Sequence, residues 1–327
     1  MRILMNLLVA AMLSAATGMW ATSALASEEF PSRPIKLIVP YPPGGGIDPT
    51  ARFFAKALSE ELGAPFVIQN TGGASGQIGT ELAAKAAPDG YTLLFASAAP
   101  NAILPAALPK LPYSNDDFVP ITLIGSAAYV LVINPAVPAN NIRELLQGLK
   151  QRPDMIGNFG SSGQLSGPHL AGELFRMLAN AEMTHVAYRG NGPALTAVLG
   201  GEVPMMFASA PAVMPHVKDG RLKALGISAA HPASTLPELP ALGAELPGLE
   251  VAQWYGLMAP KGTADAVVQK IYAAAARAMA SKGLNDQLST HGVEARPMTP
   301  AQFGDFLAAE TRKYKDVVER ARLVVGQ

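Results

Sequence analysis

The sequence predicts an α/β protein. Short, continuous apolar runs alternate with segments of helical spacing along almost the whole chain, and many of the runs end in glycine-rich turns. Buried parallel strands are apolar on both faces, so unbroken runs of this kind favour parallel pairing. Hydrophobic residues make up 49% of the 327 residues, which excludes a disordered polypeptide. Because domains typically have about 100–200 residues, the length predicts two of them.

The first 26 residues have the pattern of an export signal. Arg2 gives a positive start, a nearly uncharged apolar run covers residues 3–16, and Ala24-Leu25-Ala26 supplies the small-x-small sequence that precedes cleavage. A membrane anchor is the alternative, but a spanning helix needs about 20 apolar residues, and Thr17 and Gly18 interrupt the run early. We therefore expect cleavage after Ala26 and an exported, soluble mature chain.

Composition excludes several classes of protein. The sequence has no cysteine, so it forms no disulfide, thiolate metal site, cysteine nucleophile or lipidated N-terminus. Its 25 basic and 25 acidic residues balance, which argues against nucleic acid as a partner, because phosphate recognition needs a basic stripe.

In the first part of the chain the pattern repeats strand, glycine loop and helix. Strands are expected at 35–39, 66–68 and 91–96, and helices at 48–62 and 78–87. After Pro120 the same order continues. The expected strands are 129–133, 155–159, 183–187, 203–207 and 222–228, with helices at 141–150 and 168–178 and another opened by Pro193.

The last part of the chain begins with a proline-rich stretch, 231–249, which we interpret as a surface connection. A strand at 251–258 and a helix at 264–281 with apolar residues at helical spacing follow. Thr299-Pro300-Ala301-Gln302 is a capping box and predicts a final helix that runs to about Leu323.

Four glycine-rich loops lie between a strand and a helix, at 44–46, 72–76, 161–163 and 190–192. A helix N-terminus leaves N–H groups unpaired and carries a partial positive charge, and glycine lets a ligand approach the backbone. Several such loops converging on one cleft would bind a carboxylate. Each loop alone could be a tight turn, but 44–46 and 161–163 together favour binding. Asp48 is better explained as an N-cap than as a ligand contact.

Motifs of catalysis are missing. There is no Gly-x-Ser-x-Gly or Walker loop, and Pro49 stands where a dinucleotide fingerprint needs its third glycine. The five histidines show no metal-ligand spacing. Ser161, Ser162 and His169 could form a hydrolytic set, but no residue is placed to act as the orienting acid. The hydroxyls suit hydrogen bonding to a carboxylate better. We expect no enzyme, no metal and no cofactor.

These motifs, in this order, resemble the Bug-type solute-binding proteins of tripartite tricarboxylate transporters. The resemblance covers essentially the whole mature chain. It rests on PSRPI (31–35), YPPGGGID (41–48), ASGQIGT (74–80), APDGYTLL (87–94), GSSG (160–163), HLAGELF (169–175) and the segment from Tyr188-Arg189-Gly190 to Gly200-Gly201.

The resemblance implies a two-lobed, type II-like periplasmic-binding-protein fold, each lobe a mainly parallel sheet flanked by helices. Residues 28–125 with 251–327 would form one lobe and residues 126–250 the other, with crossings near 125–126 and 253–254. It also implies a monomeric periplasmic receptor that captures a small organic carboxylate and delivers it to a membrane permease.

The candidate ligand-binding residues come from both lobes: Tyr41, Gly44, Gly45, Gly46, Asp48, Ser97 and Asn101 in the first, and Ser161, Ser162, Gly163, His169, Arg189, Gly190, Ala208 and Ser209 in the second. Arg189 replaces the family's usual lysine and could grip a carboxylate with two hydrogen bonds. The ligand stays open among dicarboxylates, amino acids and aromatic acids. Two other functions also stay open: a sensor that presents its closed form to a signalling partner, and an exported serine hydrolase.

Overall fold

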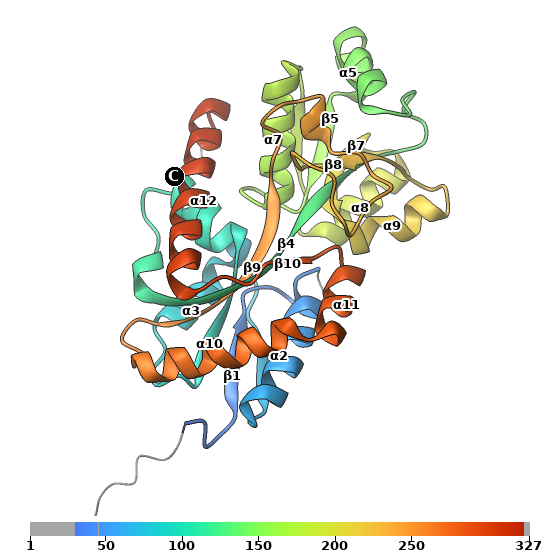
Figure 1. The fold of residues 1–327 in the computed structure, drawn as a ribbon. Coiled ribbons are helices and arrows are strands. Elements are labelled where there is room, and N and C mark those ends of the chain that lie inside the picture. The colour runs from blue at the N-terminus through green and yellow to red at the C-terminus, as the bar shows by residue number, and fades with distance from the viewer. Residues whose placement is uncertain (1–29, 45, 324–327) are drawn as a thin grey trace, which may run out of the picture. The chain divides into compact units, whose positions relative to one another are not determined.

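The computed structural model describes residues 30–44 and 46–323. Residues 33–323 belong to one compact unit, and residues 30–32 belong to the N-terminal segment that precedes it. The predicted export signal and Gly45 lie outside the described residues. The description below concerns the unit that starts at Arg33, in which helices and strands alternate as predicted (Figure 1).

The strands pair into one sheet. Within the described residues it has ten strands, in the order β2-β1-β3-β9-β4-β7-β5-β6, and β10 and β8 also pair with β4. The strands of its first half are β1 (Ile35–Val39), β2 (Phe66–Asn70), β3 (Thr92–Ser97), β9 (Ala252–Pro260) and β10 (Glu294–Ala295). Those of its second half are β5 (Asn158–Ser161), β6 (Thr184–Ala187), β7 (Met205–Ser209) and β8 (Lys223–Ile227).

One long strand, β4 (Phe118–Ile133), links the two halves. It pairs antiparallel with β9 as far as Ala128 and with β7 from Tyr129 onward. Gly125 of β4 lets β10 pair closely with this strand, because a Cβ at Gly125 would collide with the carbonyl of Glu294 in β10. The outer strands, β1 with β2 and β3, and β5 with β6 and β7, pair in parallel as expected. The antiparallel pairs are those made by β4 and β9.

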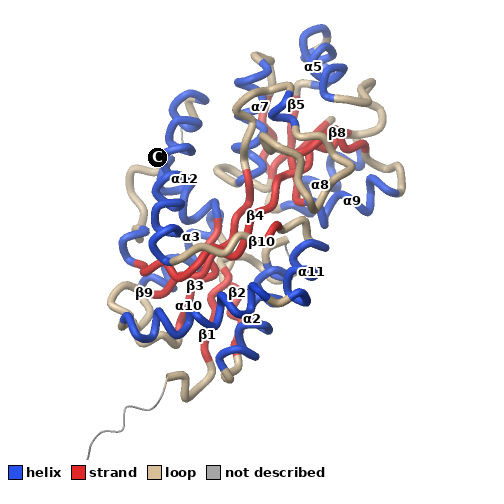
Figure 2. Tube along the Cα trace, viewed as in Figure 1, coloured by secondary structure: helices blue, strands red, loops and turns tan. Residues whose placement is uncertain are grey.

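Helices lie on both sides of the strands (Figure 2). Those of the first half are α2 (Asp48–Leu62), α3 (Gln77–Ala84), α4 (Leu104–Ala107), α10 (Asp265–Ala280), α11 (Lys282–Thr290) and α12 (Pro300–Ala321). Those of the second half are α5 (Ile142–Gln151), α6 (Pro153–Ile156), α7 (Gly167–Ala179), α8 (Asn191–Gly200) and α9 (Ala210–Lys218). Single turns occur at η1 (Ala74–Gly76), η2 (Ala99–Ile103), η3 (Asn115–Asp117) and η4 (Leu242–Ala244). Among the described residues, no helix combines the length and the apolar character needed to cross a membrane.

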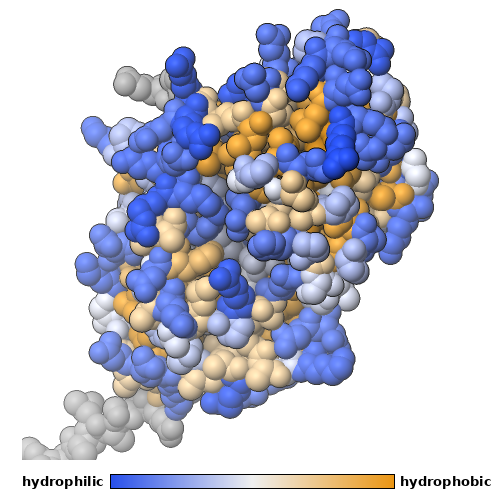
Figure 3. All heavy atoms as spheres, turned by 45° about the horizontal axis from the view of Figure 1, so that its top comes forward, coloured by the Kyte–Doolittle hydropathy of each residue, from blue (hydrophilic) through white to orange (hydrophobic). Residues whose placement is uncertain are grey.

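The core is apolar and continuous along the sheet. Trp254 of β9 is buried against Phe303 and Phe306 of α12, which begins with the predicted capping box at Thr299. Polar residues cover most of the face shown in Figure 3, with smaller apolar groups between them.

Some expected elements were wrong. The expected strand 155–159 is instead a helical turn, α6, followed by β5, because Pro153 opens a turn that ends at Gly157. The expected helix 264–281 ends at Ala280, and Ser281 caps a further helix, α11. The segment 231–249 is more than a surface connection, because it buries five leucines: Leu236, Leu239, Leu242, Leu246 and Leu249.

Three helical segments and most of β4 were not expected. Prolines at the start of η2, α4 and α9 sit in first helical turns, where the missing N–H costs nothing. The proline inside α9, Pro215, also argued against a helix there. Only residues 129–133 of β4 were predicted to be a strand. The remainder contains Pro120 and small residues around Gly125, and its pairing with β9 decides its conformation.

Candidate functional site

The first glycine loop is held in place by Asp48. Its buried carboxylate accepts hydrogen bonds from the Gly44 N–H (3.1 Å), Arg52 Nε (2.9 Å) and Asn70 Nδ2 (2.9 Å). Burial would raise the pKa of Asp48, but the hydrogen bonds from Arg52, Asn70 and Gly44 outweigh it and lower the pKa. The N-cap interpretation was wrong: Ile47 is the N-cap of α2, and Asp48 is the first helical residue. Asp48 therefore acts as the anionic anchor of the loop.

A second polar group lies where β3 ends. The Tyr41 hydroxyl is 3.1 Å from Ser97 Oγ, and the Ser97 N–H donates to Asn101 Oδ1 at 3.2 Å. Asn101 in turn bonds Asn115 of η3. Burial raises the pKa of Tyr41 to about 12, with the Ser97 hydrogen bond acting the other way. Three of the predicted residues are thus brought together, with Tyr41 as a neutral hydroxyl.

The loop after β5 is organised around Ser161. Ser161 Oγ is fully buried, lies 3.0 Å from the Gly163 carbonyl, accepts from the Gly163 N–H (3.1 Å) and is 2.6 Å from His185 Nε2. Ser166 caps α7 and also donates to the Gly163 carbonyl at 2.7 Å. Ser162 and Gly163 are partly exposed. The side chain of Ser161 shapes the loop, and the groups open to a ligand belong to Ser162 and Gly163.

Two histidines stack beneath this loop. The rings of His169 and His185 are 3.9 Å apart between centroids, and His169 Nδ1 accepts from the Leu165 N–H at 3.1 Å. Burial, and then the neighbouring His185, lowers the pKa of His169 to about 3, and burial lowers the pKa of His185 to about 4. Both rings are neutral at neutral pH, so they fix the loop without attracting an anion.

The loop after β6 leads into α8. Arg189 is exposed, Gly190 is the N-cap of the helix, and Asn191 is its first residue. Asn191 Oδ1 is buried and has no hydrogen-bond partner among the described residues. Buried polar groups are usually hydrogen-bonded, so this amide oxygen is an acceptor that the described residues leave available.

The loop after β7 faces the first glycine loop. Ala208 is buried in β7, and Ser209 is the N-cap of α9 without a side-chain capping bond. Ser209 Oγ is buried, has no partner among the described residues, and lies 3.1 Å from where a Cβ on Gly46 would stand. A hydroxyl of the second half of the sheet thus lies directly opposite the glycine loop of the first.

A hydrogen bond joins two other loops from the two halves. Ser75 Oγ of η1 donates to the carbonyl of Gln164 at 3.0 Å. Ala74, Ser75 and Leu165 all have left-handed backbone conformations, with φ of 47°, 54° and 55°. Non-glycine residues adopt this conformation at a cost, so the two loops are held in strained shapes where they meet.

The site therefore forms two clusters that face each other at Gly46 and Ser209. Sequence reasoning missed Asn70, His185 and the Ser75–Gln164 contact, whereas Asn191 lies in the predicted glycine loop 190–192. Asn70 carried a signal, since it is polar and ends a parallel strand at the edge where loops gather. His185 lies within a strand, and the sequence around it contains no comparable signal. That the predicted residues bind a ligand stays a prediction.

The chemistry of the site favours binding. Among the described residues, no group of three or more acidic or histidine side chains could hold a metal ion. The pair Ser161–His185 has the spacing of a nucleophile and base, but no ion pair among the described residues joins His185 to a carboxylate. Neutral hydroxyls, amides and helix N-termini are suited to holding an anion by hydrogen bonds.

Comparisons with known proteins agree with this geometry. The model of the tripartite tricarboxylate transporter family receptor, TctC, matches residues 50–323. Protein BugT of Bordetella pertussis is 36% identical over 298 residues, which cover 90% of this chain and 91% of BugT. The structure of R. palustris Rpa4515 with adipate is 30% identical, with a TM-score of 0.83 over 90% of this chain and 99% of that one. MatC from Rhodopseudomonas palustris with bound malate is 31% identical, with a TM-score of 0.79 over 88% and 100%. The two-lobed α/β fold predicted from the sequence is confirmed.

Proposed function

The chain belongs to the tripartite tricarboxylate transporter receptor family, and on that premise we propose that it captures a small organic carboxylate between its lobes and delivers it to a membrane permease. It works in the periplasm after removal of residues 1–26. The lobes comprise residues 28–125 with 251–327, and residues 126–250. It has no catalytic activity. The adipate and malate bound to two similar proteins support the choice of a carboxylate.

The observation that carries this proposal is the unpartnered Ser209 Oγ opposite Gly46. A buried hydroxyl without a hydrogen bond costs free energy, and a ligand oxygen bound between the two loops would remove that cost. The free N–H groups at the start of α2, α8 and α9 lie on the same loops and would supply further donors. An ionised carboxylate offers about four lone-pair sites on its two oxygens and carries a negative charge, whereas an amide or an alcohol offers two sites on one neutral oxygen.

The ligand class is tested by thermal unfolding of the protein without residues 1–26, after unfolding and refolding to remove any bound ligand. The panel contains dicarboxylates, amino acids and aromatic acids, each with its amide. A ligand at 100 times its Kd stabilises by about 2.7 kcal/mol, which shifts the melting temperature by a few degrees. We expect an acid to shift it and its amide not to. If no acid does so, the carboxylate assignment is wrong.

The location of the site is tested with Gly46→Ala. The new Cβ would stand 3.1 Å from Ser209 Oγ and fill the space between the loops. We expect the shift caused by the ligand to be lost while the ligand-free melting temperature stays near that of the wild type. Gly283→Ala is the matched control, because that glycine lies in α11 with nothing within 4 Å of its added Cβ. Equal binding by both variants would place the ligand elsewhere.

A further inference from the structure

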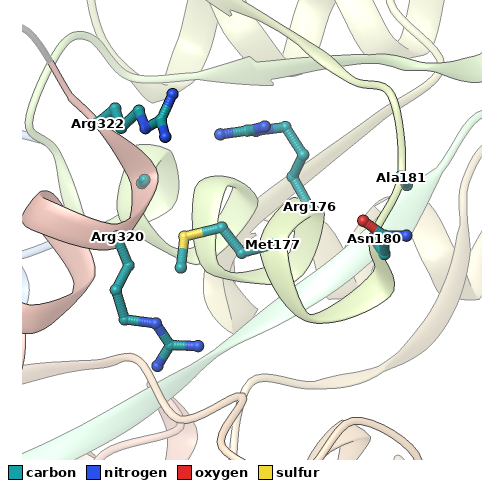
Figure 4. A pocket seen from close by; sticks show the side chains of 7 residues that line it. Arg176, Met177, Asn180, Ala181, Arg320 and Arg322 are labelled. Atoms are coloured by element: carbon teal, nitrogen blue, oxygen red, sulfur yellow. The ribbon is translucent and has the colours of Figure 1, made fainter.

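A pocket lies between the C-terminal ends of α7 and α12, and none of the glycine-loop residues lines it (Figure 4). It has a volume of about 560 Å³. The residues that line it are Arg176, Met177, Asn180, Ala181, Arg320, Ala321 and Arg322. Three arginines in one small pocket give it a strongly cationic lining.

Two of these arginines have partners and one does not. Arg176 forms an ion pair with Glu173, with Nη2 2.9 Å from Oε2. Arg320 forms one with Asp316, with Nη1 3.3 Å from Oδ2. Arg322 is exposed and makes no ion pair with the described residues. It follows the last residue of α12 with φ of 51°, a turn in the backbone that leads the chain away from the helix. Among the described residues, the pocket therefore has one guanidinium without an ion pair.

The guanidinium ends of Arg176 and Arg322 point toward one another across the pocket (Figure 4). The partial negative charge at a helix C-terminus explains a cation near each helix end. This partial charge does not explain why the two guanidinium groups point into the same space. Their mutual repulsion favours conformations in which each side chain points into solvent. An anion between them would convert that repulsion into two charge-assisted attractions.

We propose that this pocket binds an oxyanion, a phosphate or a carboxylate group, between Arg176 and Arg322, while Arg320 is directed away from them and paired with Asp316. Guanidinium groups present paired N–H donors that match the oxygens of either anion. This site is separate from the one proposed for the glycine loops, because none of the glycine-loop residues lines the pocket.

An anion bound here would join the two halves of the sheet. α7 packs on β5, β6 and β7, whereas α12 packs on β4 and α4, and the two helices also contact each other. Arg176 belongs to α7, and Arg320 and Arg322 come from the end of α12. The bound anion therefore contacts the ends of both helices and holds them together. A movement of one lobe relative to the other would change the affinity of the pocket for the anion.

The test is calorimetric titration of the protein with inorganic phosphate, against sodium chloride of matched ionic strength. We expect phosphate to bind the wild type, and Arg322→Gln to weaken it by about tenfold or more, because a hydrogen bond to a charged group is lost. Arg312→Gln is the control, since Arg312 is exposed on the same helix but does not line the pocket. Citrate in a parallel titration shows whether carboxylates are preferred to phosphate.

Hydrogen exchange adds a structural measurement. Phosphate should slow exchange in the last turns of both α7 and α12 in the wild type and in neither helix of the Arg322→Gln variant. The proposal is overturned if phosphate has no effect beyond that of chloride, or if Arg312→Gln weakens binding as much as Arg322→Gln. Gly46→Ala should bind phosphate normally, and loss of binding there would assign the anion to the glycine loops instead.

Discussion

At the scale of single residues, Asp48 fixes the shape of the first glycine loop of the candidate site. The Asp48 carboxylate accepts hydrogen bonds from the Gly44 N–H and the Asn70 side-chain amide. Asn70 also donates a hydrogen bond to the Tyr41 carbonyl at 3.0 Å. One buried acid therefore sets the shape of the loop that carries Gly46. An acid that faced the ligand would repel a carboxylate, whereas one turned inward and paired with Arg52 does not.

We expect Asp48→Asn to lower the free energy of unfolding at neutral pH by about 1.5–3 kcal/mol, the usual contribution of hydrogen bonds to a charged group. Because the folded-state pKa of Asp48 is lowered, its stabilisation is complete above the unfolded-state pKa and is lost as pH falls through the folded-state pKa. Urea unfolding of both proteins should thus differ at pH 7 and converge in acid. Asp286→Asn, at an exposed pair with Lys282, should change little. A gap that persists in acid would contradict the electrostatic account.

The stacked histidines predict acid sensitivity. The pKa values of His169 and His185 are about 3 and about 4, against about 6.5 in an unfolded chain. The unfolded chain takes up protons first, so stability is complete above about pH 6.5 and falls toward pH 4, by about 1.4 kcal/mol per pH unit for each histidine. The double variant His169→Asn, His185→Gln keeps polar groups at the hydrogen-bonding positions but cannot titrate. It should show a much smaller pH dependence in urea unfolding.

His231→Asn provides the comparison for that experiment, because His231 is exposed. It should keep the pH dependence of the wild type. If the double variant also keeps it, other groups cause the acid sensitivity and the two buried rings do not.

At the scale of elements, strand ends and loops decide the site. β1, β5 and β6 lead through short loops into helices, and these loops carry Gly46, Ser162 and Gly190, whereas β7 leads directly into α9 at its last residue, Ser209. β5, β6 and β7 run parallel, so their carboxyl ends lie at one edge of the second half, which is where α/β proteins usually bind ligands. β1 belongs to the parallel set of the first half, and Gly46, which follows it, approaches Ser209 from that half. Ser75 and Gln164 add the contact that ties a loop of one half to a loop of the other.

We expect Ser75→Ala to speed release of the bound carboxylate by about twofold to tenfold, the effect of losing a hydrogen bond worth about 0.5–1.5 kcal/mol. The association rate should change much less, because the bond forms only when the loops meet. Stopped-flow exchange with an acid identified by thermal shift measures both rates. Ser289→Ala, at an exposed position in α11, is the control. Unchanged release from Ser75→Ala would mean that this contact does not hold the ligand in.

At the scale of the whole molecule, β4 joins the two halves of the structure into one sheet. Its pairing changes from β9 to β7 between Ala128 and Tyr129. α7 and α12 meet at the arginine pocket, which none of the glycine-loop residues lines. The two halves are joined by the shared strand, the Ser75–Gln164 contact and the α7–α12 contact, and also by hydrogen bonds from Ser234 and Thr235 to Glu294 and Gly292. Each of these offers a separate point for testing how the lobes move.

The sequence by itself determined the α/β class, most strands and helices, the capping box of α12 and the family. These properties depend on residues within a few positions of one another: apolar runs, helical spacing, caps and short motifs. The four glycine loops were recognised for the same reason, since each lies between its own strand and helix.

Only the tertiary structure decided which groups meet. The length of β4 comes from its pairing with β9, and the helix α9 forms despite Pro215. No local pattern could place Ser209 opposite Gly46, His185 against Ser161, or Arg322 facing Arg176, because each pair joins segments that are distant along the chain. The contacts that shape the candidate site arise when the two halves of the sheet and their helices pack together, and packing depends on the whole chain at once.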